Sequence, residues 1–192
     1  LSSDSTDGYQ NIFIHQNLIV HNGRNGSGEY ADNNVIDLYN NSEIISGNNL
    51  NLSFIFNTMT DNYATNSVIG VSGVLVYVDL LSSILYDQTT PNVANLSGAF
   101  HSVNADCVVL SDTNSLQQPY VTRTRDFSID PGFVYRHYDY HLKSSSLLID
   151  FCDDSQSSVV FTDKDIDDEL RTYDLVSLPD AYGPWDIGAD EF

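Results

Sequence analysis

Asn51-Leu-Ser-Phe-Ile-Phe56 followed by Asn57-Thr-Met-Thr-Asp-Asn62 is the stretch that most directly indicates the fold, because its pattern recurs twice in the chain. The other copies are Asn11-Ile-Phe-Ile-His-Gln16 with Asn17-Leu-Ile-Val-His-Asn22, and Tyr77-Val-Asp-Leu-Leu-Ser82 with Ser83-Ile-Leu-Tyr-Asp-Gln88. Each copy has an alternating apolar strand, a polar corner residue, a second short strand and a polar exit. Intervals of 40 and 26 residues between the copies suit solenoid coils with loops of different length.

Segments between the copies also have the character of strands. Residues 35–39 (Val-Ile-Asp-Leu-Tyr) and 68–71 (Val-Ile-Gly-Val) are short runs rich in β-branched residues, and we expect them to form strands on other faces of the coil. No window of about 12 residues combines helix caps with a helical period. The sequence therefore predicts an all-β fold rather than a helical bundle or a doubly wound sheet.

The asparagines are distributed unevenly along the chain, because all 18 lie at or before Asn114. Corners of a coil need left-handed or bridge backbone angles, which Asn tolerates better than other non-glycine residues. Stacked Asn side chains can also form hydrogen-bonded ladders along the coil axis. We expect such a ladder here, although a general preference for Asn in polar loops is the simpler alternative.

Aspartate and the basic residues dominate the rest of the chain. From Arg123 onward lie 14 of the 23 aspartates and six of the seven basic residues. We interpret residues 1–114 as Asn-rich coils and residues 115–192 as Asp-rich C-terminal coils with a capping segment, together forming one continuous domain. A cap is needed because the last coil of a solenoid otherwise exposes backbone hydrogen-bonding groups.

The charge balance limits the partners of this protein. Twenty-seven acidic and seven basic residues give a net charge of −20, which repels nucleic acid and anionic membranes. The same charge makes a polyuronate substrate unfavourable unless cations bridge the like charges. No apolar run reaches the roughly 20 residues that a membrane span requires.

The C-terminal residues resemble those of a known family. Asp130-Pro131-Gly132-Phe133, Tyr140-His141-Leu142, Leu148-Ile149-Asp150 and the closing Asp186-Ile-Gly-Ala-Asp-Glu-Phe192 occur in the order seen at the C-terminal end of secreted, pectate-lyase-like proteins. The resemblance spans residues 130–192. It implies a right-handed parallel β-helix with a loop-rich C-terminal cap, and a secreted or cell-surface protein of bacterial type. The strands of such a coil are expected to bury apolar residues on the inside, here Ile12, Ile14, Leu18, Val20, Leu52, Phe54, Phe56, Val76, Val78, Leu80, Ile84 and Ile187. It implies no reaction, because this fold carries lyases, hydrolases, adhesins and stalks.

The same resemblance implies roles for particular residues near the C-terminus. Ile187 and Ala189 are expected to pack inward, while Asp186 accepts hydrogen bonds from neighbouring backbone. In the family, the position matching Asp168 is usually glycine, so this chain departs from the pattern in its Asp-rich turn.

Two groups of residues are candidates for catalysis. Arg123, Arg125 and Asp126 resemble pectate-lyase chemistry, in which an arginine is the base and Ca²⁺ acidifies the proton beside the uronate carboxyl. Asp61 and Asp87 occupy equivalent positions in the repeat and could stack as the carboxylate pair of a glycosidase. The alternative is that both are corner residues that accept hydrogen bonds from backbone N–H groups.

Metal ligands are suggested by the densest carboxylate group, Asp163, Asp165, Asp167 and Asp168, since Ca²⁺ prefers oxygen ligands. The group lacks the glycine and the distal Glu of an EF-hand. The alternative is a solvated acidic turn in which Arg171 pairs with one carboxylate. The five histidines do not show the spacing of a metal site.

The only cysteines, Cys107 and Cys152, could form a disulfide in an oxidising compartment, or remain two buried thiols.

From these features together we hypothesise a non-catalytic extracellular β-helix element, such as a stalk, an adhesin segment or a self-stacking filament subunit. The alternative is the C-terminal part of a polysaccharide lyase or glycoside hydrolase.

The start of the chain suggests a partner. The strand pattern begins by Asn11 with only a short polar lead. We expect this first coil to contact either upstream coils of a longer chain or a second copy stacked end to end. A polysaccharide is a further possible partner.

Overall fold

The computed structural model describes residues 9–22, 35–40, 49–63, 66–73, 75–87, 94–96, 102–112, 116–117, 119–153, 164–170 and 181–189. Within these ranges the protein is all-β and contains no α-helix, as the sequence predicts. The strands are β1 (Tyr9–His15), β2 (Leu18–Val20), β3 (Ile36–Asn40), β4 (Asn49–Ile55), β5 (Thr58–Thr60), β6 (Ile69–Gly73), β7 (Val76–Tyr86), β8 (Ala94–Leu96), β9 (Ser102–Leu110), β10 (Val121–Arg123), β11 (Asp126–Phe127), β12 (Phe133–Tyr135) and β13 (Asp139–Leu142).

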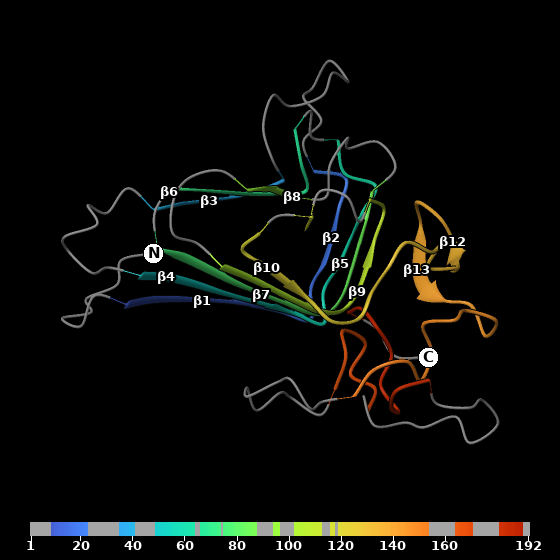
Figure 1. Cartoon of the computed structure of the whole chain (residues 1–192). Helices are drawn as coiled ribbons and strands as arrows, with labels where there is room; N and C mark the ends of the chain where they lie inside the picture. Colours follow the sequence, from blue (N-terminus) through green and yellow to red (C-terminus); the bar gives the residue numbers. More distant parts are fainter. Residues whose placement is uncertain are drawn as a thin grey trace, which may run out of the picture.

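Parallel pairing organises the chain into two sheets and one hairpin. The large sheet has eight strands and bends at a corner into two arms (Figure 1). The first arm contains β1, β4, β10 and the first halves of β7 and β9; the second arm contains β2, β5, β11 and the second halves of β7 and β9. Strands β3, β6 and β8 form a second parallel sheet, and β12 pairs with β13 in an antiparallel hairpin.

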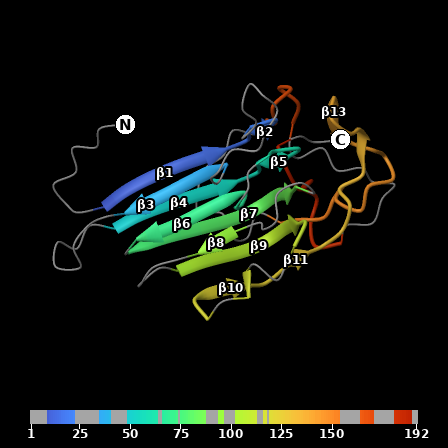
Figure 2. The ribbon, with the colours of Figure 1, turned by 90° about the horizontal axis from the view of Figure 1, so that it is seen from above.

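The observed register confirms the alignment of the sequence repeats. Asn51 of β4 pairs with Asn11 of β1 and with Tyr77 of β7, and Thr58 pairs with Leu18 and Ile84 in the second arm. Seen from above, β1, β4, β7 and β9 follow one another across the sheet in chain order (Figure 2). The expected strands at residues 35–39 and 68–71 are present as the parallel pair β3 and β6.

Two further copies of the pattern were not recognised from the sequence. Ser102 of β9 pairs with Tyr77, and Val121 of β10 pairs with Val103. These copies lack the corner Asn and follow at shorter intervals, so the residue pattern alone did not reveal them. The parallel sheet thus continues past residue 114 into β10 and β11.

Each corner depends on one residue with a left-handed backbone. Gln16, Phe56, Ser82 and Cys107 occupy equivalent positions in the register and have φ between 44° and 56°. The sequence hypothesis that Asn adopts this conformation is therefore wrong at these corners. Asn17 and Asn57 stand one position later, and the Asn57 side chain bonds backbone groups of the preceding repeat.

The first ladder joins Asn17, Asn57 and Ser83. The Asn17 backbone N–H donates to Asn57 Oδ1 at 2.9 Å, and the Asn57 N–H donates to Ser83 Oγ at 3.1 Å. The Asn57 Nδ2 group donates to the carbonyls of Ile14 and Ile55 at 2.7 and 2.9 Å. Because Asn57 is fully buried, these bonds satisfy polar groups that water cannot reach.

A second ladder runs along the exit of the second arm. The Asn22 N–H donates to Asn62 Oδ1 at 3.0 Å, and the Asn62 N–H donates to Asp87 Oδ2 at 2.6 Å. The Asn62 Nδ2 group donates to the carbonyls of Ile19 and Thr60, both at 3.0 Å. The expected asparagine ladder is thus confirmed twice.

The corner also decides which side chains face the core. In β4, even-numbered residues such as Leu52 and Phe54 are buried in the main core. Beyond the corner, in β5, the odd-numbered Met59 is buried in the same core. An inserted left-handed residue shifts the alternation of a strand by one position. Predicted core residues that follow the first-arm alternation are confirmed, with Ile12 and Ile14 partly buried and Val76, Val78 and Leu80 fully buried.

Other predicted core residues lie outside the main core. Leu18 is 37% exposed, and Val20 shares its face of β2. Phe56, Ile84 and Ile187 are buried, but in separate clusters that include C-terminal residues. The prediction is wrong for Leu18, because it ignored the shift at the corner. For Phe56, Ile84 and Ile187 the predicted burial is confirmed, but in clusters other than the main core.

The C-terminal residues pack on the outer face of the second arm. Ile187 and Leu148 contact the same cluster as Ile84 and Val109. Gly188 has φ of 116°, and a Cβ atom there would lie 2.7 Å from Thr58 Oγ1, so only glycine fits this close approach. The capping role of residues 115–192 stays a prediction, since the described contacts cover the side of the sheet.

We predict that Asn57→Ala lowers the free energy of unfolding by about 2–4 kcal/mol, because it leaves several buried backbone groups without hydrogen bonds. Asn51→Ala is the matched control: its Nδ2 group bonds Asn11 Oδ1 at 2.9 Å on the exposed face, and its loss is expected to cost less than about 1 kcal/mol. Urea unfolding measures both values, and equal losses would contradict the role of the buried ladder.

Candidate functional site

The hairpin of β12 and β13 projects side chains toward the corner of the second arm. Its entry is fixed by the Asp130-Pro131-Gly132 turn, in which Asp130 Oδ1 accepts the Gly132 N–H at 2.9 Å and Gly132 has φ of 74°. Ser146 Oγ donates to the Pro131 carbonyl at 2.6 Å, and the Lys143 N–H donates to the Gly132 carbonyl at 2.9 Å. The turn that carries the family resemblance therefore positions the hairpin.

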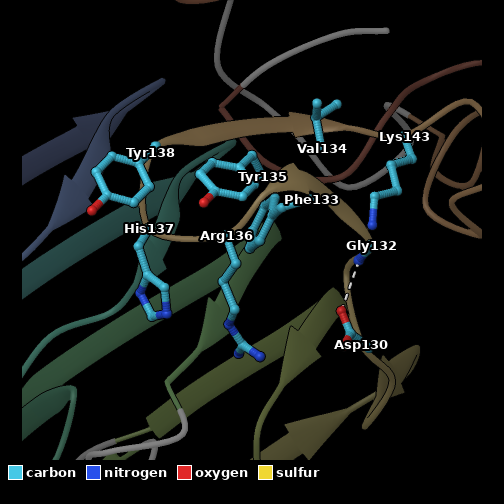
Figure 3. A pocket seen from close by; sticks show the side chains of 9 residues that line it. All are labelled: Asp130, Gly132, Phe133, Val134, Tyr135, Arg136, His137, Tyr138 and Lys143. Carbon is cyan, nitrogen blue, oxygen red and sulfur yellow. Dashed lines mark hydrogen bonds between the residues drawn. The ribbon is translucent and has the colours of Figure 1, made fainter.

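An open pocket of about 390 Å³ lies beside this hairpin (Figure 3). The rings of Tyr135 and Tyr138 stack with centroids 5.3 Å apart and are 63% and 80% exposed. Arg136 lies over the Tyr86 ring, 5.5 Å from its centroid, and Lys143 lines the pocket. The pocket thus combines an exposed aromatic pair with two cations, in a chain whose net charge is −20.

Next to this pocket, the structure brings Asp61 together with groups that are distant in sequence. Asp61 Oδ2 accepts a hydrogen bond from the Tyr140 hydroxyl at 2.9 Å and lies 2.9 Å from His137 Nδ1. The Tyr140 hydroxyl also lies 3.4 Å from His21 Nε2. Burial, followed by the hydrogen bond to Asp61, raises the pKa of Tyr140 above its ordinary value, so the phenol stays protonated.

The sequence did not lead us to predict this cluster, although the repeat pattern contains a signal for two of its members, His21 and Asp61. His21 and Asp61 occupy equivalent positions, each one residue before a ladder asparagine, and the His21 N–H donates to the Asp61 carbonyl at 3.2 Å. This repeat position could have placed the two side chains together. Nothing local in the sequence placed His137 and Tyr140 beside them.

Asp61 and Asp87, which we expected to stack as a carboxylate pair, accept hydrogen bonds from different partners. Both carboxylates are buried, at 6% and 1% exposure, so neither is a solvated corner. Asp87 accepts the Asn62 N–H and therefore occupies the ladder position rather than the position of Asp61. The alternative interpretation, that Asp87 satisfies backbone N–H groups, agrees with this contact.

The arginine candidates are held in ion pairs. Arg125 donates to Asp106 through Nε at 2.8 Å and through Nη2 at 2.6 Å, and its Nη2 lies 3.0 Å from Asp153 Oδ1. These bonds, chiefly the one to Asp106, raise the pKa of Arg125 above its already high ordinary value. Arg123 pairs with Asp126 three residues away. A lyase base needs a guanidinium directed at substrate, whereas Arg125 is engaged by two carboxylates.

A disulfide lies directly beside the Arg125 ion pairs. Cys107 and Cys152 are bonded, with Cα atoms 6.1 Å apart, which confirms the pairing expected from the sequence. Asp106 and Asp153 are the sequence neighbours of these cysteines. One covalent bond and one bridging arginine thus hold the C-terminal residues to β9 at the same corner.

The aspartates proposed as Ca²⁺ ligands have separate partners where the structure describes them. Asp165 Oδ1 accepts the N–H groups of Asp167 and Glu169, both at 2.9 Å. Asp167 Oδ2 lies 2.8 Å from His141 Nε2, and Asp168 Oδ1 lies 2.7 Å from Lys164 Nζ. Asp163 and Arg171 fall outside the described residues, so a Ca²⁺ site here stays a prediction.

The backbone conformation at Asp168 is notable because the resemblance led us to expect glycine at this position. Asp168, which stands where glycine is usual, has φ of 73° and adopts the left-handed conformation that glycine would favour. The other expectations from the resemblance are confirmed for Ile187 and Ala189, which are buried, and for Asp186, whose Oδ1 accepts the Asp150 N–H at 2.8 Å.

Comparison of the chain with protein-family models, with curated proteins and with solved structures finds no match. In the part of the chain that the structure describes, no helix has the length and hydropathy needed to span a membrane.

We predict that Arg125→Met lowers the free energy of unfolding by about 3–5 kcal/mol, because it removes the ion-pair partner of the buried Asp106 carboxylate. Arg123→Met is the control, since Asp126 is a local partner nearer to solvent; we expect a loss of about 1 kcal/mol. Urea unfolding of the oxidised protein measures both. If the two variants lose the same stability, the bridging role of Arg125 is wrong.

Proposed function

We propose that this protein is a non-catalytic extracellular element whose strands wind as coils of a right-handed parallel β-helix. The order of the strands supports this path. The chain passes through the first arm in β1, the second arm in β2 and the three-stranded sheet in β3. The next three strands, β4, β5 and β6, then pair in parallel with β1, β2 and β3. Crossover connections between parallel strands are right-handed in almost all proteins. The in-register Asn ladders fit a stack of such coils.

An open sheet edge at the first coil carries the proposal of assembly. Among the described residues, β1 pairs only with β4, β2 only with β5, and β3 only with β6. An unpaired edge presents N–H and C=O groups that can accept another strand. We propose that another coil of the same kind binds this edge, as in a stalk or filament.

The backbone direction in β1 identifies the groups that would form the contact. The Gln16 N–H donates to the Ile55 carbonyl of β4 at 3.2 Å. Because N–H groups alternate between the two sides of a strand, those of Ile12 and Ile14 also face β4, and that of Phe13 faces the open edge. The Phe13 side chain is 59% exposed, so the residue has little role inside the coil.

The ion pairs support a non-catalytic role. Arg125 is bound by Asp106 and Asp153, and Arg123 by Asp126, so these candidates hold the fold together. The disulfide suits an oxidising, extracellular environment. The acidic surface favours solubility of an elongated structural element.

In a head-to-tail stack, β1 of one copy would meet the edge formed by β10 and β11 of the next, and repetition of this heterologous contact gives a filament. We predict that Phe13→Pro reduces assembly of the purified chain by at least about tenfold, because proline removes the N–H at the open edge. Light scattering and electron microscopy over a range of concentrations measure the effect.

The matched control is Ile14→Pro, which removes an N–H that faces β4. It should lower the free energy of unfolding by about 3 kcal/mol, whereas Phe13→Pro changes it by less than about 1 kcal/mol. A chain that stays monomeric at every concentration, or a Phe13→Pro variant that assembles like the parent, would contradict self-stacking.

A second candidate function, binding of an anionic polysaccharide, is favoured by the pocket in Figure 3. Stacked Tyr135 and Tyr138 offer a flat apolar surface to a sugar ring, and Arg136 and Lys143 offer positive charge to its carboxylates. We predict that Tyr138→Ala weakens binding of polygalacturonate by at least about tenfold. Tyr182→Ala, which alters a 52% exposed tyrosine elsewhere, is the control.

The same polysaccharide tests the alternative that the chain is the C-terminal part of a lyase or hydrolase. Binding without release of unsaturated products or reducing ends supports the non-catalytic proposal. Cleavage that is lost in Asp61→Asn, with the fold retained in circular dichroism, would establish the enzymatic alternative instead.

A further inference from the structure

We propose that His21, Asp61 and His137 bind a divalent transition metal ion, with Zn²⁺ as the best match. Each residue offers one ligand atom, and the three atoms lie within 4.8 Å of one another. The residues come from the exits of the first two coils and from the hairpin turn between β12 and β13. The inference does not depend on the proposed assembly, although His21 directly follows the edge strand β2.

The geometry requires only a small contraction around the ion. Zn²⁺ binds His nitrogen at about 2.0–2.1 Å and carboxylate oxygen at about 2.0–2.2 Å, so ligand atoms in a tetrahedral site are about 3.3 Å apart. His137 Nδ1 already lies 2.9 Å from Asp61 Oδ2. The two histidines are exposed, and rotation of their side chains can bring the third ligand atom inward.

The ligand set selects among metals. Two imidazoles and one carboxylate suit Zn²⁺ and similar transition metals, whereas Ca²⁺ and Mg²⁺ prefer sites made of oxygen ligands. Asp61 is the only one of the three that is buried, at 6% exposure. Its buried carboxylate supplies negative charge that a bound cation would compensate.

Tyr140 supports Asp61 from outside the ligand set. Its hydroxyl donates to Asp61 Oδ2 at 2.9 Å, and its ring packs edge-on against Phe133 at 5.5 Å. Outer partners of this kind hold metal-binding side chains in orientation. The carboxylate is therefore positioned by the fold before an ion arrives.

The site has an entrance and space for another ligand. A pocket of about 410 Å³ is lined by His21, Tyr63, His137 and Tyr138. An ion can enter from this side, and a water molecule can complete a tetrahedral shell above three protein ligands. Because His21 and Asp61 belong to the coils and His137 belongs to the hairpin, the ion would tie the hairpin to the corners of two stacked coils.

Titration of tag-free, metal-free protein with Zn²⁺ in a calorimeter tests the proposal. We expect saturable binding of one ion per chain and a melting temperature that rises with Zn²⁺ concentration, as mass action requires. His137→Ala and His21→Ala should each weaken binding at least about tenfold. Both residues are exposed, so the variants keep the fold that circular dichroism reports.

His141→Ala is the matched control. His141 is an exposed histidine of the same hairpin that lies beside two carboxylates, Asp139 and Asp167. Its removal should change the Zn²⁺ affinity by less than about twofold. Absence of saturable binding, or a loss in His141→Ala as large as that in His137→Ala, would overturn the site.

Substitution with Co²⁺ gives an independent readout of the ligand geometry. A tetrahedral site with nitrogen and oxygen ligands should produce visible absorption bands that His137→Ala removes and His141→Ala retains. An octahedral spectrum unaffected by His137→Ala, or equal competition by Mg²⁺, would show that the three residues do not form the site.

Discussion

The left-handed residue at each corner is the constraint on which the rest of the structure depends. Gln16, Phe56, Ser82 and Cys107 turn the large sheet through the same bend in successive repeats. The turn leaves backbone groups that neither arm can pair, and the following ladder residue satisfies them. Because Asn17, Asn57 and Ser83 repeat this arrangement at the same register position, the strands on both sides of these corners stay in register.

The corners also serve as attachment points for the C-terminal residues. Cys107 forms the disulfide with Cys152, and Phe56 packs against Trp185 with ring centroids 5.2 Å apart. A left-handed residue directs its side chain away from the core, so these positions can reach a segment on the outside. The same property places His21 and Asp61 next to the hairpin. Loss of this arrangement would expose the apolar cluster around Ile84 and Ile187.

Two clusters of charged groups in the described part of the chain bear differently on function. Arg125, Asp106 and Asp153 satisfy one another beside the disulfide, as expected of a structural crosslink. The cluster of His21, Asp61 and His137 instead places potential ligands next to a pocket, where the two histidines are exposed and Asp61 is buried. The first kind stabilises the fold, while the second kind is the site at which we propose metal binding.

The sequence by itself determined the all-β class of the fold, the register of the first three repeats and the presence of an asparagine ladder, because alternation and repeat spacing are local properties of the chain. It also indicated the disulfide and the turn at Asp130. Only the tertiary structure decided that Ile19 rather than Leu18 faces the core, since the bend at Gln16 shifts the alternation. Only the tertiary structure joined His137 to Asp61, because that contact depends on the path of the backbone between them rather than on any spacing in the sequence.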